Sequence, residues 1–288
     1  MRLCMFDKAG VATLGARMAD GIVDLSVAAP GLPGDIVGVL ASGEDGLGRI
    51  GQAITSAPES ARVDADGVRY HPPVARPGKI ICLGLNYADH AKEGGHARPE
   101  YPSFFMRSAT SLVAHGEPMV RPDASEQLDY EAELVAVVGR RARHVPVEEG
   151  LSVVGGYSVF NDGSVREYQR KTSQWTIGKN FDATGGFGPD VVTVDDVPPG
   201  ATGLRIQSRL NGEVLQDANT DDMLFGVAET VALVTTCMTL EPGDLLVMGT
   251  PAGVGHARTP PLWMKPGDVC EIEIEGVGLL RNPIVGEG

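Results

Sequence analysis

Two glutamates, Glu131 and Glu133, are the first candidates for chemistry in the sequence. They stand two positions apart in the largely apolar run Leu128–Val138. Because the side chains of a strand alternate between its faces, both glutamates are expected on the same face. Both faces of the run are otherwise mostly apolar, which predicts burial on both sides. Two buried like charges need a cation, so the pair is a candidate metal site, although a bare Glu-x-Glu pattern is also common without one.

A second alternating run, Glu271–Glu275, provides a control within the same chain. Its three glutamates fill one face of the predicted strand, and the other face is apolar. This pattern is typical of a strand that has one face in solvent. We therefore expect these glutamates to be solvated rather than to bind a metal.

Asp162 is the third candidate metal ligand. It follows the apolar run Tyr157–Phe160, at a predicted junction between a strand and a helical turn. Three carboxylates without a nearby histidine or cysteine suit a hard cation, with Mg2+ favoured and Mn2+ or Ca2+ as alternatives. A second interpretation is that Asp162 caps the turn that follows it.

A base for proton transfer is predicted at His90. Glu93 lies three positions later, on the same face of a helix predicted from Asn86, as its N-cap, to the glycines Gly94 and Gly95. A carboxylate beside an imidazole selects its tautomer and raises its basicity, so the pair can activate water. The glycines also predict a flexible end to a lid. The alternative is a surface helix with both side chains in solvent.

Four further polar residues are candidates for binding the substrate or an oxyanion. Lys179 would neutralise the carboxylates and hold an oxyanion, with a surface salt bridge as the alternative. Arg166 and Gln169 lie three positions apart after Asp162. Arg166 can bind a carboxylate through two hydrogen bonds and Gln169 can donate to a carbonyl, or both can belong to a charged helix face. Thr250, in a Gly-Thr-Pro-Ala-Gly loop, would contact a substrate carboxylate or belong to a plain turn.

The elements that must position these residues are short strands separated by turns. The chain holds 38 glycines and 20 prolines without any period, which favours a β-rich or mixed fold. Asn211-Gly212 between two strand-like runs is a hairpin signal, and the run 226–238 is the clearest amphipathic helix. The proline-rich segment His71–Gly78 predicts a boundary after a small N-terminal unit.

The composition excludes several classes of function. The 288 residues carry 38 acidic and 24 basic side chains, a formal net charge of −14, which argues against nucleic-acid and anionic membrane partners. No apolar run approaches the ~20 residues that span a bilayer, and Met1–Asp7 does not resemble a signal peptide. The four cysteines, which are widely spaced, are expected to be small core residues: Cys4, Cys82, Cys237 and Cys270. Their spacing favours a reduced, cytoplasmic protein. His96 is given no role, and the remaining histidines are expected at the surface or in turns: His71, His115, His144 and His256.

An ordered series of short motifs runs from about Lys79 to Pro283. The series is Gly84-Leu85-Asn86-Tyr87 with His90 and Glu93; Pro102-Ser103-Phe104-Phe105; Asp129-Tyr130-Glu131-Ala132-Glu133-Leu134; Asn161-Asp162 with Arg166 and Gln169; Trp175 to Gly178-Lys179; Asn211-Gly212-Glu213; Pro242-Gly243-Asp244; Gly249-Thr250-Pro251 with Gly253-Val254-Gly255; and Pro266-Gly267-Asp268. Taken together, these motifs resemble the fumarylacetoacetate hydrolase superfamily. Some positions depart from the usual pattern of the superfamily. Gly163-Ser164-Val165 stands where a larger residue, then Ser or Thr, then Ala is commoner, and Arg107 stands where lysine is frequent.

The resemblance implies the fold, the metal and the class of substrate. The fold would be α+β and β-rich, a mixed β-sandwich roll over residues 73–288 that follows a small α/β domain over residues 1–72. The metal would be Mg2+ or Mn2+, bound by Glu131, Glu133 and Asp162. The substrates would be small 2-oxo or β-diketo acids, and the protein would be a homodimer.

The favoured expectation is metal-assisted hydrolysis of a C–C bond in a β-diketo acid such as an acylpyruvate or fumarylpyruvate, which releases pyruvate or a related 2-oxo acid and a carboxylic acid. His90, aided by Glu93, would deprotonate the attacking water, and Lys179 would help to hold the enolate. The substrate would be oriented by Arg166, Gln169 and Thr250. The alternative on the same metal site is a decarboxylase or isomerase of a 2-oxo dicarboxylic acid, because both use the same enolate. A non-catalytic ligand-binding protein is a further alternative.

Overall fold

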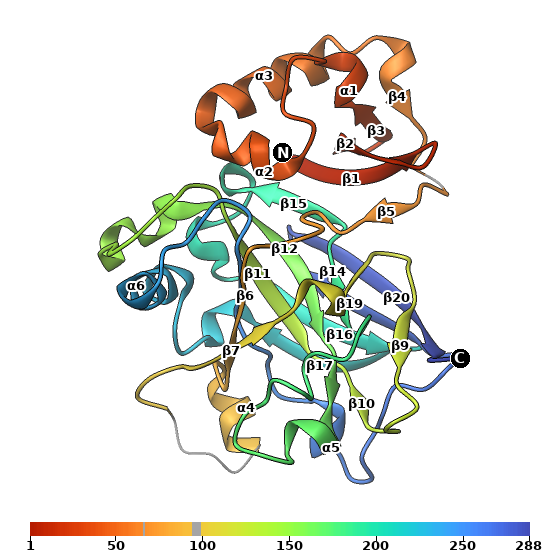
Figure 1. Cartoon of the computed structure of the whole chain (residues 1–288), viewed down its shortest axis with the longest axis vertical. Helices are drawn as coiled ribbons and strands as arrows, with labels where there is room; N and C mark the ends of the chain where they lie inside the picture. The colour runs from red at the N-terminus through yellow and green to blue at the C-terminus, as the bar shows by residue number, and fades with distance from the viewer. Residues whose placement is uncertain (66, 94–98) are drawn as a thin grey trace.

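The computed structural model describes residues 1–65, 67–93 and 99–288, and its strands form three sheets (Figure 1). The main path of the largest sheet runs β4-β3-β2-β1-β15-β12-β11-β18-β6-β7, and β5, β8 and β14 pair beside it. Its strands have these bounds: β1 Arg2–Lys8, β2 Val11–Met18, β3 Gly21–Asp24, β4 Arg62–Val63, β5 Tyr70–His71, β6 Ile80–Gly84, β7 Ser103–Arg107, β8 Leu112–Ala114, β11 Ala132–Val138, β12 Val154–Asp162, β14 Gly185–Phe187, β15 Asp190–Thr193 and β18 Leu245–Val247.

The second sheet has the order β17-β16-β19-β20-β9, and β10 and β13 form a two-stranded ribbon. The bounds of these strands are β9 Met119–Arg121, β10 Leu128–Asp129, β13 Ser164–Val165, β16 Arg205–Leu210, β17 Glu213–Asn219, β19 Val269–Ile274 and β20 Gly278–Gly286. The predicted hairpin is confirmed, since β16 and β17 pair around Asn211 and Gly212. Both turn residues have positive φ, 53° and 84°, as a tight hairpin turn requires.

The helices are short and few in the described part of the chain. Their bounds are α1 Leu25–Ala28, α2 Ile36–Ala41, α3 Gly43–Thr55, α4 Ala88–Glu93, α5 Arg166–Gln169 and α6 Val227–Cys237. The predicted helix over 226–238 is confirmed as α6. None of the helices that the structure describes is both long enough and apolar enough to cross a bilayer.

The hydrophobic core lies on both faces of β11. Leu134 belongs to a buried cluster that includes Ile272 of β19, in the five-stranded sheet. Val135 and Val137 alternate to the opposite face and belong to a second cluster with Ile50 of α3. The burial on both sides that the apolar alternation predicted is therefore confirmed, and any charged side chain on this strand lies in the interior.

The predicted strand Leu128–Val138 is interrupted at Tyr130 and Glu131, so the expectation of one continuous strand was wrong. β10 pairs with β13, and only β11 joins the large sheet. Side chains replace the missing strand partner, because Asp129 Oδ1 accepts a hydrogen bond from Tyr130 N at 2.9 Å and Asn161 Oδ1 accepts one from Glu131 N at 3.1 Å. The interruption leaves Glu131 directly before the first residue of β11, outside the paired part of the strand.

The N-terminal residues continue the large sheet. β1 pairs with β15, with Leu3 opposite Val191, and both residues belong to the second core cluster. This part, with α1, α2 and α3, occupies one end of the molecule, and α4 and α5 lie at the other (Figure 1). The expected boundary at residue 72 falls directly after β5. The division into two domains stays a prediction.

Three of the four cysteines are core residues, as expected. Cys4, Cys82 and Cys270 are buried, whereas Cys237, the last residue of α6, is exposed. The expectation of a core position was therefore wrong for Cys237. Burial raises the pKa of Cys270 to about 12, so its thiol is a neutral, unreactive group at ordinary pH.

Candidate functional site

Three carboxylates meet where β11 and β12 pair. Glu133 lies in β11 opposite Phe160, Asp162 ends β12, and Asp162 N donates to the carbonyl of Glu131 at 3.0 Å. One ligand atom from each side chain lies within 4.8 Å of the others, and all three side chains are buried. The structure thus brings the three predicted metal ligands together. The alternative role of Asp162 as a helix cap is wrong, because the N-cap of α5 is Val165.

Three cationic side chains surround these carboxylates. Lys179 Nζ lies 2.7 Å from Glu131 Oε2 and 2.5 Å from Asp162 Oδ2. Arg107 contacts the other oxygen of Asp162, Oδ1, at 2.5 Å, and Arg166 Nη2 lies 2.6 Å from Glu131 Oε1. Lys179 is only 2% exposed, so the alternative interpretation, a salt bridge at the surface, is wrong. Its ammonium neutralises charge inside the cluster.

Glu133 is the one carboxylate of the three that pairs with no Lys or Arg among the described residues. Its Oε2 accepts a hydrogen bond from Gly249 N at 2.6 Å, while burial and then the charges of Asp162 and Glu131 raise its pKa well above the usual range. Burial also raises the pKa of Glu131, but the charges of Lys179 and Arg166 lower it overall. A buried carboxylate without a counter-charge either takes up a proton, as the raised pKa favours here, or binds a further cation. Because every donor is a carboxylate oxygen, the residues fit a hard divalent ion.

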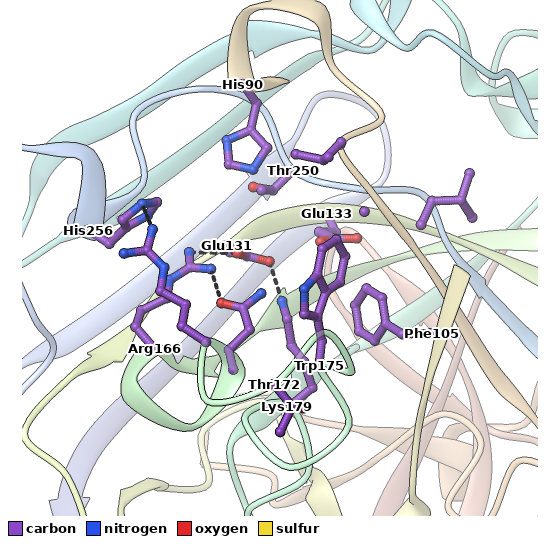
Figure 2. A pocket seen from close by; sticks show the side chains of 15 residues that line it. His90, Phe105, Glu131, Glu133, Arg166, Thr172, Trp175, Lys179, Thr250 and His256 are labelled. Carbon is purple, nitrogen blue, oxygen red and sulfur yellow. Dashed lines mark hydrogen bonds and ion pairs between the residues drawn. The ribbon is translucent and has the colours of Figure 1, made fainter. Parts of the chain in front are cut away.

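The cluster opens into a cavity of about 350 Å³, which is large enough for a small organic acid. Figure 2 shows unlike walls on the two sides of Glu131. Phe105 and Trp175 form an aromatic wall, with ring centroids 5.5 Å apart in an edge-to-face arrangement. Arg166 and His256 lie on the other side. A substrate bound with one end at the carboxylates would therefore meet an apolar wall on one side and a basic wall on the other.

His90 lines the same cavity, on the side marked by Thr250 in Figure 2. Its Nδ1 lies 3.5 Å from Glu93 Oε2, and Glu93 accepts a hydrogen bond from Gly253 N at 3.1 Å. Burial raises the pKa of Glu93, but the contacts from His90 and Gly253 lower it overall. The pair therefore forms at the cavity, and Nε2 is left for proton transfer. The predicted helix end and flexible hinge at Gly94 and Gly95 lie outside the described residues.

The segment that carries His90 is held by Asn86 rather than capped by it. Helix α4 begins at Ala88, so the predicted N-cap at Asn86 was wrong. The Asn86 side chain is buried, and its Nδ2 donates to the carbonyls of Phe225 at 3.0 Å and Met248 at 2.7 Å. These hydrogen bonds allow the Asn86 amide to be buried, because a buried amide without partners would be costly.

The three predicted substrate-binding residues all line the cavity. Each also forms a side-chain hydrogen bond with another residue of the chain. Arg166 Nε donates to Asp129 Oδ2 at 2.8 Å, and its Nη1 donates to Gln169 Oε1 at 2.8 Å. Thr250 Oγ1 accepts a hydrogen bond from Gln216 Nε2 at 2.9 Å. These contacts fix the orientation of the polar groups before any substrate enters.

Sequence reasoning assigned no role to three residues that organise the site. Arg107 is buried and holds Asp162, and Asp129 is buried and holds Arg166. Trp175 forms part of the cavity wall. The signals were an arginine that ends the apolar strand β7 and an acidic residue two positions before Glu131, and both are typical of buried ion pairs.

His256 was expected at the surface or in a turn, and the expectation was wrong in part. It lies in a short turn but lines the cavity and is half-buried. Burial, then the neighbouring Arg166 and Arg170, lower its pKa to about 4. His256 is therefore neutral at ordinary pH.

Comparison with known proteins identifies the family. A family model described as the C-terminal part of fumarylacetoacetate (FAA) hydrolase matches residues 79–285. The chain belongs to the fumarylacetoacetate hydrolase family. A curated relative, the mitochondrial oxaloacetate tautomerase Fahd2a of Rattus norvegicus, is 37% identical over 273 residues, which are 94% of this chain and 86% of the relative. An uncharacterized protein of Methanocaldococcus jannaschii is 42% identical over 212 residues, 74% of this chain and 85% of that protein.

Solved structures with this fold include enzymes named for different reactions. Fumarylacetoacetate hydrolase from Exiguobacterium antarcticum superposes with a TM-score of 0.85 at 33% identity, and maleylpyruvate hydrolase from Sphingobium sp. SYK-6, solved with manganese(II) and pyruvate, with 0.81 at 29%. Both matches cover 100% of each chain. The 5-carboxymethyl-2-hydroxymuconate delta-isomerase of Mycobacterium smegmatis gives 0.78 at 27%, also over 100% of each chain. The predicted family and the strand-rich α+β fold are confirmed, and the family includes both hydrolases and isomerases.

Proposed function

We propose that this member of the fumarylacetoacetate hydrolase family is a metal-dependent tautomerase of a 2-oxo dicarboxylic acid, with oxaloacetate as the first substrate to test. Its similarity to oxaloacetate tautomerases over 94% to 99% of the chain supports this. The structural observation that carries the proposal is the His90–Glu93 pair at the same cavity as Lys179 and the carboxylates. Keto–enol exchange needs a base and a positive charge near the oxygen. The sequence left hydrolysis, decarboxylation and isomerisation open, and the similarity to tautomerases favours isomerisation.

The metal in this proposal is Mg2+ or Mn2+, held by Glu131, Glu133 and Asp162. When bound, such a cation supplies Lewis-acid stabilisation of negative charge on the substrate oxygens. The donor set of carboxylate oxygens and the absence of a counter-charge at Glu133, among the residues described, support a hard ion. The manganese in the structure of the Sphingobium hydrolase supports the same class of metal.

His90 is the base in this proposal. Because Glu93 Oε2 lies 3.5 Å from Nδ1, the imidazole proton is placed on Nδ1 and Nε2 acts as the base. Nε2 takes a proton from C3 of the keto acid to leave the enolate, and solvent water protonates the enolate oxygen to give the enol; the reverse reaction returns both protons. Lys179 stabilises the charge that develops on the 2-oxo oxygen. Burial lowers the pKa of Lys179, but the carboxylates of Asp162 and Glu131 raise it overall. Lys179 therefore remains a fixed ammonium throughout the reaction.

The test is the rate at which enol-oxaloacetate absorbance disappears after dilution into buffer, with metal-stripped protein and added Mg2+ or Mn2+. We expect a metal-dependent acceleration that His90→Asn reduces by roughly 100- to 10,000-fold, the usual contribution of a general base. His144→Asn is the matched control, because His144 is exposed and does not line the cavity. If the wild-type protein gives no acceleration over buffer with either metal, the proposed function is wrong.

Hydrolysis of a C–C bond in a β-diketo acid is the second candidate. The similarity to a maleylpyruvate hydrolase solved with manganese and pyruvate favours it specifically. In this reaction His90 would take a proton from water, the water would add to the distal carbonyl, and Lys179 would stabilise the departing pyruvate enolate. Incubation with acetylpyruvate and fumarylpyruvate, followed by assay of pyruvate and free acid, separates the two. Release of both products would favour the hydrolase, and turnover of enol-oxaloacetate alone would favour the tautomerase.

A further inference from the structure

One guanidinium at the cavity takes no part in the chemistry described so far. Arg170 directly follows α5 and lines the cavity beside His256. Among the described residues it pairs with no carboxylate, and its side chain contacts His256 Nε2. Arg166 and Lys179, by contrast, each contact two carboxylates. In a chain with a net charge of −14, a cavity arginine without an acidic partner is suited to bind an anion.

His256 and its turn hold this guanidinium in place. Turn η7 (Gly255–Ala257) is anchored because Gly255 N donates to Asp129 Oδ1 at 2.8 Å and His256 N donates to Asp129 Oδ2 at 2.9 Å. The same Asp129 carboxylate accepts from Arg166 in α5. The neutral imidazole of His256 accepts a hydrogen bond from Arg170. The Arg170 side chain is exposed at the mouth of the cavity, and His256, whose turn is anchored by the buried Asp129, sets its orientation.

We infer that Arg170, oriented by His256, binds a second carboxylate of the substrate, distal to the 2-oxo group. This inference rests on the proposed function and names the residues that recognise the second carboxylate of its substrate. The 2-oxo end of the substrate belongs at the carboxylate cluster. The distal end then meets either the aromatic wall or the side of His256 (Figure 2), where Arg170 contacts the imidazole. The aromatic wall suits an apolar group, and the arginine suits a carboxylate. The enzyme therefore selects dicarboxylic over monocarboxylic 2-oxo acids.

The test compares two acids that differ only at the distal end. Oxaloacetate has a carboxylate where 2-oxobutanoate has a methyl group, and exchange of the C3 protons with deuterated solvent reports enolisation of both by NMR. With the Mg2+-loaded enzyme we expect a higher kcat/KM for oxaloacetate. Arg170→Gln should lower the ratio of the two kcat/KM values by about 10- to 100-fold, mainly through the KM of oxaloacetate. An unchanged ratio would overturn the inference.

Lys171→Gln is the matched control for the loss of one positive charge. Lys171 is the next residue, is exposed, lies 3.6 Å from the ring centroid of Tyr168 and does not line the cavity. We expect less than about a twofold change in the ratio, because Lys171, unlike Arg170, does not line the cavity and its exposed charge is screened. An equal fall in both variants would contradict a specific subsite and indicate a general effect of charge.

His256 provides a second, independent variant. His256→Leu removes the acceptor for Arg170 and should lower the same ratio, whereas His256→Gln retains a side-chain acceptor and should restore part of it. A merely structural role would lower the turnover of both acids equally and leave the ratio unchanged. That result would overturn the positioning role of His256.

Binding separates failure of this inference from failure of the proposed function. Trp175 lines the cavity, so its fluorescence reports the Kd of each acid for the Mg2+-loaded protein without any turnover. If the wild type exchanges neither acid, the proposed function is wrong and binding decides the subsite alone. Tighter binding of oxaloacetate that Arg170→Gln abolishes supports the subsite, and equal affinity for both acids overturns it.

Discussion

Two groups of glutamates with the same spacing behave differently in this protein. Glu131 and Glu133 lie in the interior at the start of β11, whereas Glu271 and Glu273 of β19 lie on a face that reaches solvent. Arg209 lies 3.3 Å from Glu271 Oε2 and 2.6 Å from Glu273 Oε2. The spacing of the glutamates is the same in both groups. The groups differ in the face that carries the glutamates, which is otherwise apolar in β11 and mostly acidic in β19. A buried alternating pair collects cations and a candidate metal, while a solvated one pairs with surface arginines.

The largest expected difference between the two groups is in metal binding. Glu133→Gln should weaken Mn2+ or Mg2+ binding by roughly 100-fold or more, because one anionic ligand is lost. It should not destabilise the metal-free protein, since burial and the neighbouring carboxylates already favour an uncharged side chain at Glu133 and glutamine is uncharged too. Titration calorimetry with the stripped protein measures the first effect and thermal unfolding the second. Glu273→Gln is the matched control and should leave metal affinity unchanged, and a loss as large as that of Glu133→Gln would remove the distinction.

The buried counter-charge should matter next most. Lys179→Met leaves Glu131 and Asp162 without their shared ammonium, so the free energy of unfolding of the metal-free protein should fall by about 3–5 kcal/mol. Urea unfolding measures this change. Lys265→Met, at an exposed lysine, should change the same quantity by no more than about 0.5 kcal/mol. Similar losses for the two lysines would show that the interior cluster depends little on Lys179.

His115 extends the comparison to a half-buried group away from the carboxylates. Burial, then Arg17 and Arg281, lower its pKa from 6.5 to about 4. The unfolded chain therefore binds a proton first as pH falls, so the stability that the neutral imidazole contributes is complete above pH 6.5 and is lost towards pH 4. Relative to His115→Asn, the wild type should lose roughly 2 kcal/mol in that window. Parallel stability curves for the two proteins would contradict a lowered pKa.

The smallest expected effect lies on the solvated face. A double-mutant cycle of Arg209→Met and Glu273→Gln should give a coupling energy below about 1 kcal/mol, because the Glu273 side chain is 47% exposed and that of Arg209 is 20% exposed. Added salt should weaken it further. Urea unfolding of the four proteins measures the coupling. A salt-independent coupling of several kcal/mol would mean that this surface pair behaves like a buried one.

The sequence predicts the fold and the central residues of the site where the local pattern of apolar residues indicates which side chains are buried. The apolar alternation around Glu133 predicts a strand with two buried faces, and the ordered motifs predict the family. The interruption before β11 could not be predicted, because the acceptor for Glu131 N is the side chain of Asn161, thirty residues away. The role of Asn86 was missed for the same reason, since its partners Phe225 and Met248 are distant in sequence.

The sequence by itself determined which residues can bind a cation and move a proton, because residue type and spacing set the charge, the face and the chemistry of each group. The tertiary structure decided which of them share one cavity. It gave Glu133 no counter-charge among the described residues, and it brought Arg170 and His256 to the same wall. These outcomes depend on burial and on contacts between distant segments, and no short pattern in the chain encodes either.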